Sequence, residues 1–342
     1  MKLLFENWRK FVTEGGNVFA GQTASIPREF IEPTLEKYYA ELKRLFPKKE
    51  KVFDSFRPLG SVGKKPTSGD IDLANDTRNF FEGGEVTPEA LEEWELDPIA
   101  WQKTYEKYKS RARTSTDAQI GWRAFLTEIA KYINSNSDMI VSNLKKIGPG
   151  TMFSLFPQFN ENGEQQDIGV QMDWMIGSID WLEFAYWSDK LSEDQEFLKG
   201  LHRTQLILSM FLIKDHTFTH ASGVKNKTTG KLVATPGEAL SLLSELFGSQ
   251  ITRGDTLNFN TLHDWLQTNA SVEDYNAVIG AYLVILDRTK SVKIGEEHCG
   301  YIPRELEDAW IDRQGELKLS GKYICKGTNP KIWDHLNDET NY

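Results

Sequence analysis

The sequence LGSVGKKPTSGDIDL, residues 59–73, contains the pattern that decides the fold. It ends in a short strand-like run in which acidic and apolar residues alternate. Because side chains alternate across a strand, Asp70 and Asp72 share one face, and their apolar neighbours point into a core. Two adjacent carboxylates repel each other unless a cation lies between them, and hard oxygen ligands at this spacing suit Mg²⁺. The pattern therefore predicts a metal site on one face of a sheet.

The start of the same stretch carries groups that suit phosphate. Gly60 and Ser61 are expected to form a tight turn, whose backbone amides and hydroxyl can bind phosphate oxygens. Gly63 keeps the following loop open, and Lys64 and Lys65 add positive charge beside the turn. These residues predict a phosphate site next to the metal site.

A third carboxylate lies in a distant apolar strand. The run VQMDWMI, residues 170–176, is so apolar that an unpaired charge within it would be costly. Asp173 in this run therefore needs a partner, and a metal shared with Asp70 and Asp72 supplies one. Asp180 is the rival candidate, but it follows a Gly-Ser-Ile turn in which a solvated aspartate is expected. An isolated Asp-x-Asp is more often the wet face of an edge strand, so both interpretations stay open.

Apolar periodicity predicts a mixed α/β front half and a mostly helical back half, with the border near residue 190. The front half is expected to contain helices over 27–43, 99–112 and 116–134, a β-like run over 52–60, a strand over 70–74 and a hairpin over 151–177. In the back half, Ser192, Thr235 and Ser271 have the residue pattern of helix N-caps, and Gly248 closes the second of these helices.

Composition and charge exclude several classes of protein. The chain has 342 residues, 39% of them hydrophobic and 26% charged, which is ordinary globular material. Its net charge of −10 argues against a protein that coats duplex DNA over a broad basic face. Two cysteines, Cys299 and Cys325, exclude a disulfide framework and a four-thiolate zinc site. No apolar run approaches the roughly 18 residues of a membrane helix, so we expect a cytoplasmic protein with no membrane partner.

The combination of Gly-Ser, a short loop, Ser-Gly-Asp-x-Asp and a distant apolar-Asp-apolar strand resembles the DNA polymerase beta-type nucleotidyltransferase superfamily. This resemblance implies an α/β (α+β) fold with a small mixed sheet and helices on it. The domains that follow are an amphipathic N-terminal stub over 1–16, a nucleotidyltransferase palm over 17–190 with N-terminal helices, and a mostly helical C-terminal domain over 191–342.

The same resemblance implies an activity and roles for single residues. Members of the superfamily use two Mg²⁺ ions, with Mn²⁺ as an alternative, to transfer a nucleotide from a triphosphate such as ATP to a hydroxyl. Carried over, Gly60 and Ser61 bind the triphosphate, Asp70 and Asp72 hold both ions, and Asp173 holds the ion that activates the acceptor. The expected enzyme is a metal-dependent transferase of the polymerase beta type.

Two observations bear on the acceptor. Lys64 and Lys65 replace the arginines of the polymerase branch, and no helix-hairpin-helix motif is present, so a tRNA or a single strand is favoured over template-directed DNA synthesis. A further resemblance is to a set of tailed-phage proteins that share three segments with this chain, at Glu14–Phe19, Leu59–Asp70 and Lys199–Arg203. It implies a location in the host cytoplasm or in the virion.

Several other groups have both a functional and a structural interpretation. Lys199, His202 and Arg203 share a helix face, which is either a clamp on the triphosphate tail or an ordinary solvated face. A basic run interleaved with tyrosines can bind a single strand, although such runs are more often wet helix faces; it comprises Tyr105, Lys107, Tyr108, Lys109, Arg111 and Arg113. His216 and His220 are four residues apart, but a zinc site is not favoured because no third ligand is near.

The sequence leaves three functional alternatives open. The first is the active transferase; the second is a catalytically silent protein that binds a nucleotide or a nucleic acid. The third is a packaged phage internal protein, because residues 1–14 resemble capsid-targeting peptides that a protease removes after a glutamate. The simpler interpretation of that segment is an amphipathic stub that packs on the body of the protein.

Overall fold

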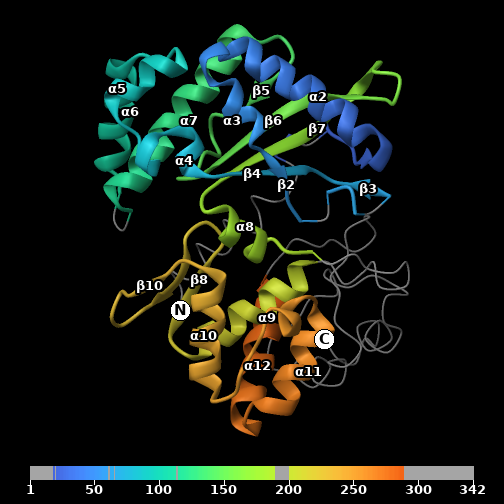
Figure 1. Cartoon of the computed structure of the whole chain (residues 1–342), viewed down its shortest axis with the longest axis vertical. Helices are drawn as coiled ribbons and strands as arrows, with labels where there is room; N and C mark the ends of the chain where they lie inside the picture. Colours follow the sequence, from blue (N-terminus) through green and yellow to red (C-terminus); the bar gives the residue numbers. More distant parts are fainter. Residues whose placement is uncertain are drawn as a thin grey trace, which may run out of the picture. The chain divides into compact units, whose positions relative to one another are not determined.

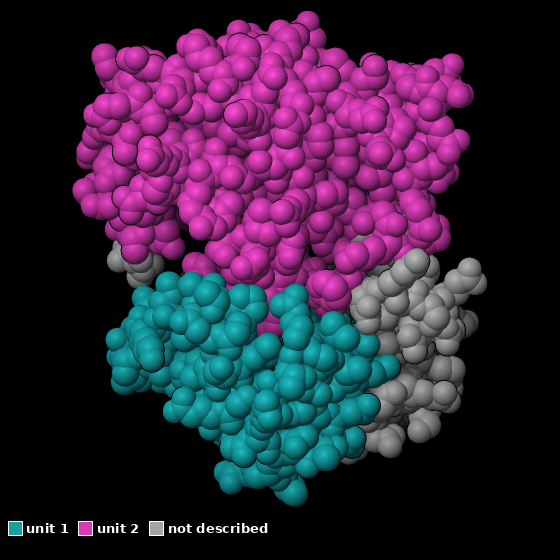
Figure 2. All heavy atoms as spheres, viewed as in Figure 1, with its two compact units in different colours: residues 1–16, 191–219, 223–342 teal, residues 17–190, 220–222 magenta. Residues whose placement is uncertain are grey.

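The computed structural model describes residues 18–19, 21–60, 62–64, 66–112, 115–188 and 200–288 (Figure 1). The chain divides into two compact units, which Figure 2 shows in different colours. The first, here called the sheet unit, contains Asn17–Lys190 and His220–Ser222. The second, here called the helical unit, contains Met1–Gly16, Leu191–Thr219 and Gly223–Tyr342. The predicted N-terminal stub lies outside the described residues.

The sheet unit is built on a five-stranded mixed sheet with the order β2-β4-β7-β6-β5. β4 and β7 are parallel, whereas the other neighbouring pairs are antiparallel. The predicted α+β class with a small mixed sheet is therefore confirmed. The strands are β2 (Arg57–Pro58), β4 (Ile71–Asn75), β5 (Val141–Ser142), β6 (Thr151–Phe159) and β7 (Gln165–Ile176). A separate two-stranded sheet joins β1 (Ile26–Pro27) to β3 (Thr67–Ser68).

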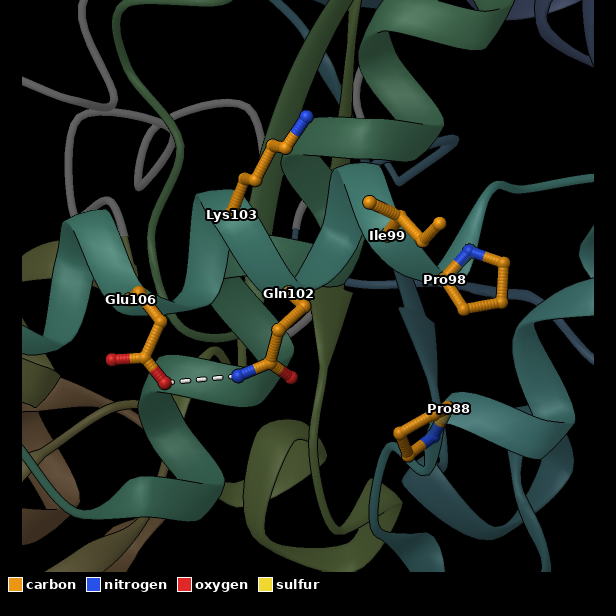
Figure 3. A pocket seen from close by; sticks show the side chains of 6 residues that line it. All are labelled: Pro88, Pro98, Ile99, Gln102, Lys103 and Glu106. Atoms are coloured by element: carbon orange, nitrogen blue, oxygen red, sulfur yellow. Dashed lines mark hydrogen bonds between the residues drawn. The ribbon is translucent and has the colours of Figure 1, made fainter.

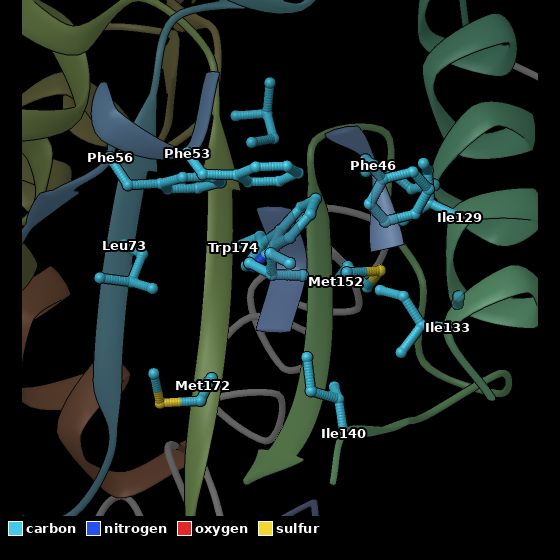
Figure 4. Close-up of a cluster of buried hydrophobic side chains, with 14 of the residues drawn as sticks. Phe46, Phe53, Phe56, Leu73, Ile129, Ile133, Ile140, Met152, Met172 and Trp174 are labelled. Carbon is cyan, nitrogen blue, oxygen red and sulfur yellow. The ribbon is translucent and has the colours of Figure 1, made fainter. Parts of the chain in front are cut away.

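One face of this sheet is covered by helices and carries the main core. Ile71 and Leu73 point into that core, as their alternation with the aspartates predicts, and Trp174 lies opposite Leu73 on β7 (Figure 4). Apolar side chains of α2 and α7 pack on the same face. The helices of the unit are α2 (Arg28–Leu45), α3 (Glu50–Asp54), α4 (Thr77–Phe80), α5 (Pro88–Leu91), α6 (Pro98–Lys109), α7 (Asp117–Asn136) and α8 (Ile179–Ala185).

The β-like run expected over 52–60 is largely wrong. Its first three residues belong to α3, and only Arg57–Pro58 forms a strand. The reason is the spacing of the apolar residues: Val52, Phe53 and Phe56 are all buried in one core. Neighbours in a strand point to opposite faces, so a strand could not bury both Val52 and Phe53 in one core, whereas a helical turn can. Phe56, two residues after α3, packs on the same core.

Within residues 200–219 and 223–288, the helical unit combines four α-helices with a small antiparallel meander of β8, β9 and β10. Three of the predicted caps are present: the Thr235 hydroxyl accepts from the Glu238 amide, the Ser271 hydroxyl accepts from the Asp274 amide at 3.1 Å, and Gly248 ends its helix in the left-handed conformation. Ser192 lies outside the described residues. The meander and α11 were not predicted. The elements are α9 (Gly200–Ile213), β8 (His216–Thr219), β9 (Gly223–Asn226), β10 (Leu232–Val233), α10 (Pro236–Phe247), α11 (Phe259–Asn269) and α12 (Val272–Arg288). Among the described residues, no helix has the length and apolar character needed to cross a bilayer.

A buried polar chain fixes α2 to the sheet. Trp174 Nε1 donates to the Tyr38 hydroxyl at 2.9 Å, and that hydroxyl lies 3.0 Å from Ser154 Oγ. Tyr38 and Trp174 are both fully buried. Losing the hydroxyl would leave the indole N–H without an acceptor in the core, and an unsatisfied buried donor costs about 1–3 kcal/mol.

We therefore expect Tyr38→Phe to lower the free energy of unfolding by about 1–3 kcal/mol in urea titrations. Tyr39→Phe is the matched control, because the neighbouring Tyr39 hydroxyl is buried and has no hydrogen-bond partner among the described residues. Removing that hydroxyl should be neutral or slightly stabilising. Equal losses in the two variants would contradict a specific role for the Tyr38–Trp174 bond.

Candidate active site

The parallel pairing of β4 with β7 brings two of the three predicted carboxylates together. Asp72 lies directly opposite Asp173 in the register, so both side chains project from the same face of the sheet. That face is the one opposite the main core. Asp70 precedes β4 by one residue and is half-buried. Its charge raises the pKa of both Asp72 and Asp173, which places all three carboxylates within mutual electrostatic reach.

Burial is the largest cause of the raised pKa of these aspartates. Asp173 is only 1% exposed, and removal from water disfavours its charged form, so that its pKa lies well above the usual range. The charges of Asp70 and Asp72 raise it further, while a hydrogen bond from Gln171 lowers it. The pKa of Asp72 is raised in the same way, by burial and by the charge of Asp70.

The oxygens of Asp173 differ in their surroundings. Oδ2 accepts a hydrogen bond of 3.0 Å from Gln171 Nε2. Oδ1 is buried and has no hydrogen-bond partner within the part of the chain that the structure describes. A buried carboxylate oxygen without a donor is costly, and a divalent cation is the partner that suits a hard anionic oxygen beside two more carboxylates. The donor set therefore fits Mg²⁺ or Mn²⁺.

Protein side chains alone do not form a complete cage here. Among the described residues, no group of three or more His, Cys, Asp or Glu side chains is arranged so that it could hold a metal ion. Mg²⁺ is commonly held by one or two carboxylates together with waters and substrate phosphates, rather than by an all-protein cage. The pair Asp72 and Asp173 matches that mode of binding.

The glycine turn lies against the carboxylates. Leu59 N donates to Asp72 O at 2.9 Å, which ties the turn to β4. Gly60 has φ +61°, and a Cβ at this position would lie 3.7 Å from Asp72 Oδ2 and 3.6 Å from Tyr186 O. The absence of a side chain keeps open the space beside the Asp72 carboxylate. Ser61, which is predicted to contact the triphosphate, lies outside the described residues.

Lys64 connects the loop to the segment after α8. Its Nζ donates to Ser188 O at 2.8 Å and lies 5.0 Å from the centroid of the Trp187 ring. The ammonium group is therefore held by the chain that follows Tyr186, whose carbonyl faces Gly60. Lys65, the other predicted cation of the loop, lies outside the described residues.

A small apolar cluster supports the site at the far ends of the two strands. It contains Leu59, Ala74, Met175 and Leu182, with Tyr186 packed against it. Leu182 comes from α8, so the cluster fixes that helix beside the acidic face. Asp180, the rival carboxylate, is exposed in the first turn of α8 rather than within a strand.

The residues of the predicted triphosphate clamp lie in the helical unit, and Lys199 is outside the described residues. His202 Nδ1 lies 2.8 Å from the Tyr282 hydroxyl, and Arg203 Nε donates to Thr256 O at 2.7 Å. Both side chains are buried, and burial together with the charge of Arg253 lowers the pKa of Arg203 to about 9. Their packing partners are those of structural side chains, and the clamp stays a prediction.

The two tyrosines of the basic run on α6 pack against neighbouring side chains. The Tyr108 ring lies 4.4 Å from the Arg123 guanidinium carbon, and its hydroxyl lies 3.0 Å from Thr127 Oγ1. Tyr105 stacks on Trp101 at 5.3 Å. These contacts are those of a packed helix face.

His216, the first of the two histidines considered as zinc ligands, has both ring nitrogens in hydrogen bonds. His216 Nδ1 lies 2.5 Å from Lys214 O, and His216 Nε2 lies 3.1 Å from Asn226 Nδ2. Both ring nitrogens therefore have hydrogen-bond partners, which leaves neither for a metal. Cys299 and Cys325 lie outside the described residues.

A hollow on α5 and α6 does not coincide with the carboxylates (Figure 3). It is lined by Pro88, Pro98, Ile99, Gln102, Lys103 and Glu106, none of which is a predicted site residue. Ile99 is 66% exposed, and Gln102 donates to Glu106 across one turn of α6. The geometry gives this hollow no chemistry of its own.

Comparison with known proteins gives matches among solved structures alone. The chain matches no protein-family description and no curated protein. Among solved structures, it is similar to polymerase beta from Leishmania infantum, determined as a ternary P/T complex. The likeness covers 74% of this chain and 87% of that chain, at 11% sequence identity and a TM-score of 0.34. At these values the likeness carries no argument about this chain.

The raised pKa values predict how stability changes with pH in the absence of metal. Asp72 and Asp173 bind protons more tightly in the folded protein than in the unfolded chain. The folded state therefore loses stability as pH rises from about 4, the ordinary aspartate pKa, through the raised folded pKa. Asp173→Asn removes one of these charges. At neutral pH in EDTA, this variant should have a higher melting temperature than the wild type. Its melting temperature should also fall less between acidic and neutral pH.

Asp180→Asn is the control, because Asp180 is exposed on α8 and should leave the pH dependence unchanged. Added Mg²⁺ should raise the melting temperature of the wild type and of this control, and should raise that of Asp173→Asn much less. Identical pH dependence of the melting temperature in all three proteins would contradict the buried, mutually repelling pair.

Proposed function

We propose that this protein is a metal-dependent nucleotidyltransferase that moves a nucleotide from a nucleoside triphosphate to a hydroxyl of an acceptor. The observation that carries the proposal is the pairing of Asp72 with Asp173 on adjacent parallel strands, with a buried Asp173 oxygen that has no donor among the described residues. Placing a buried carboxylate beside a half-buried one is unfavourable, and a bound divalent cation would remove the penalty. The resemblance of the Ser68-Gly69-Asp70-Ile71-Asp72 stretch to polymerase beta-type enzymes supports the same activity.

Three carboxylates would hold the two cations. Asp70 and Asp72 would hold both ions, and Asp173 would share the ion nearer the acceptor hydroxyl. When bound, the cations neutralise phosphate charge and make the attacking hydroxyl and the leaving pyrophosphate more stable as anions. The protein's own contribution is to fix the directions of the three carboxylates, which the paired strands do for Asp72 and Asp173.

The glycine turn and Lys64 would bind the triphosphate. Gly60 leaves room beside the Asp72 carboxylate for a phosphate chain to reach the same cation. The amides of the turn donate to phosphate oxygens, and Ser61 adds a hydroxyl. Lys64, held beside Trp187, supplies positive charge on the loop side of the turn.

The acceptor we propose is a structured or single-stranded nucleic acid, such as a tRNA, that is gripped locally. A net charge of −10 is unfavourable for contact with a long stretch of phosphate backbone. The resemblance to tailed-phage proteins supports action in the host cytoplasm, with packaging in the virion as the alternative location.

Asp72→Asn is expected to lower the rate of transfer by at least about a thousandfold, because a carboxylate shared by both cations is lost. The measurement uses each labelled nucleoside triphosphate in turn, with Mg²⁺ or Mn²⁺ and with bulk tRNA or single-stranded DNA. Asp70→Asn and Asp173→Asn should give similar losses, and Asp180→Asn should retain activity. Transfer by Asp72→Asn at the wild-type rate would exclude the proposed mechanism, and triphosphate binding without transfer by the wild type would favour a silent binding protein.

Two glycine variants separate the space beside Asp72 from backbone strain. Gly60 and Gly63 both have positive φ, +61° and +70°, so alanine at either position costs about 1–2 kcal/mol of stability. Only the methyl at position 60 approaches the carboxylate; a Cβ at position 63 has no atom within 4 Å. Gly60→Ala should therefore raise the KM for the triphosphate about tenfold or more, and Gly63→Ala should change it much less. Equal KM values would show that the turn does not face the triphosphate.

A further inference from the structure

A segment near the start of the described chain runs along the strand that carries Asp173. Residues 18–19 and 21–27 are here called the strap. Ala24 N donates to Gly169 O at 3.1 Å, and Gly169 N donates to Gln22 O at 3.2 Å. Gly169 lies in β7, so these bonds attach the strap directly to that strand. The last residues of the strap form β1.

A glycine makes this close approach possible. A Cβ on Gly169 would lie 3.2 Å from Gln22 O and 2.5 Å from Leu155 Cδ1. A side chain at this position would require Leu155 to move and the backbone at Gln22 to shift by a few tenths of an ångström, so glycine suits the close approach. At its other end the strap pairs with β3, just before the stretch that carries Asp70 and Asp72. Ile26 lies opposite Ser68, two residues before Asp70. The strap thus joins both stretches of chain that carry the carboxylates.

One side chain connects the strap to Asp173 itself. The amide N–H of Val18 donates to Gln171 Oε1 at 2.7 Å, and Gln171 Nε2 donates to Asp173 Oδ2 at 3.0 Å. Gln171 is only 2% exposed. A backbone N–H can only donate, so the Gln171 oxygen must face Val18 and its NH₂ must face the carboxylate. The two hydrogen-bond partners therefore fix which side of the Gln171 amide carries the oxygen and which carries the nitrogen.

We propose that Gln171 is a positioning residue for Asp173, and that the strap holds it in place through Val18. The bond to Oδ2 sets the rotation of the carboxyl group and leaves Oδ1 for the cation. The inference rests on the proposed function, since it assigns the purpose of a link to a carboxylate that binds metal. It goes beyond that function because it makes residues at the very start of the sheet unit part of the cation site.

The test compares two buried glutamines that hold the same strap. Gln158 is also 2% exposed, and its Nε2 donates to Ala24 O at 3.0 Å and to Gly169 O at 3.1 Å. Both of these bonds go to backbone carbonyls. Gln171→Met and Gln158→Met each remove strap contacts at nearly constant volume, but only the first removes a bond to Asp173. Mn²⁺ affinity is measured by electron paramagnetic resonance, and kcat and KM are measured with the best triphosphate.

Gln171→Met should weaken Mn²⁺ binding roughly 10–100-fold, as is usual when a partner of a metal ligand is lost, and should lower kcat more than it changes the KM for the acceptor. Gln158→Met should bind Mn²⁺ within about threefold of the wild type. Equal weakening in the two variants, or none in either, would overturn the positioning role while leaving the proposed function intact. A wild type that neither binds Mn²⁺ nor transfers nucleotide would overturn both.

Val18→Pro provides a second variant should Gln171→Met not fold. Proline lacks the N–H that binds Gln171, and the bond to Asp173 can still form. We expect Mn²⁺ affinity between those of the wild type and Gln171→Met, because Gln171 keeps its carboxylate partner but loses its anchor. Wild-type affinity and kcat in Val18→Pro would overturn the role of the strap.

Discussion

The constraint on which the sheet unit depends is the direct opposition of Asp72 and Asp173 in a parallel strand pair. Each strand must carry a charge on one face and large apolar side chains on the other. Burial and mutual repulsion make the acidic face unfavourable by itself, as the raised pKa of both aspartates reflects. The other face has to offset that cost. Leu73 and Trp174, the direct neighbours of the two aspartates, lie fully buried in the apolar core of the sheet unit.

The charge of Asp173 also acts on a group in the core behind the sheet. The Tyr38 hydroxyl, bonded to Trp174 and Ser154, has a pKa raised mainly by burial, and the charge of Asp173 adds to the shift. The Asp173 charge thus contributes to the raised pKa of Tyr38, an α2 residue on the opposite side of β7. Rigid packing beneath a metal site is useful because a ligand displaced by a fraction of an ångström binds a cation less well.

The sequence predicts the strands and the carboxylates better than it predicts what surrounds them. Alternation in residues 70–74 and 170–176 is a local signal, and the structure places Asp72 and Asp173 side by side as that signal suggests. The cap residues Thr235 and Gly248 are equally local, and they are confirmed. The pattern wrongly predicts a β-like run at Val52 and Phe53, because apolar residues in a short stretch do not distinguish a strand from a helical turn.

Gln171 could not have been identified in the same way. Its position two residues before Asp173 on the same face of a strand was visible, but a polar residue there has many ordinary explanations. What makes it informative is a bond to Val18, a residue 153 positions away in the chain. Such contacts depend on the completed fold, and no periodicity or spacing encodes them. The same holds for Lys64, whose partners at Trp187 and Ser188 lie beyond β7 and α8.

These long-range contacts imply that the proposed cation would have a second effect. A ligand that binds only the folded state stabilises it by mass action. Here the folded state requires β4, β7 and the strap to be assembled at once, because each contributes a carboxylate or holds one. The repulsion between Asp72 and Asp173 opposes that assembly, whereas a divalent cation held by both carboxylates would favour it. Under the proposed function, the same two residues would therefore destabilise the sheet unit without the cation and stabilise it with the cation.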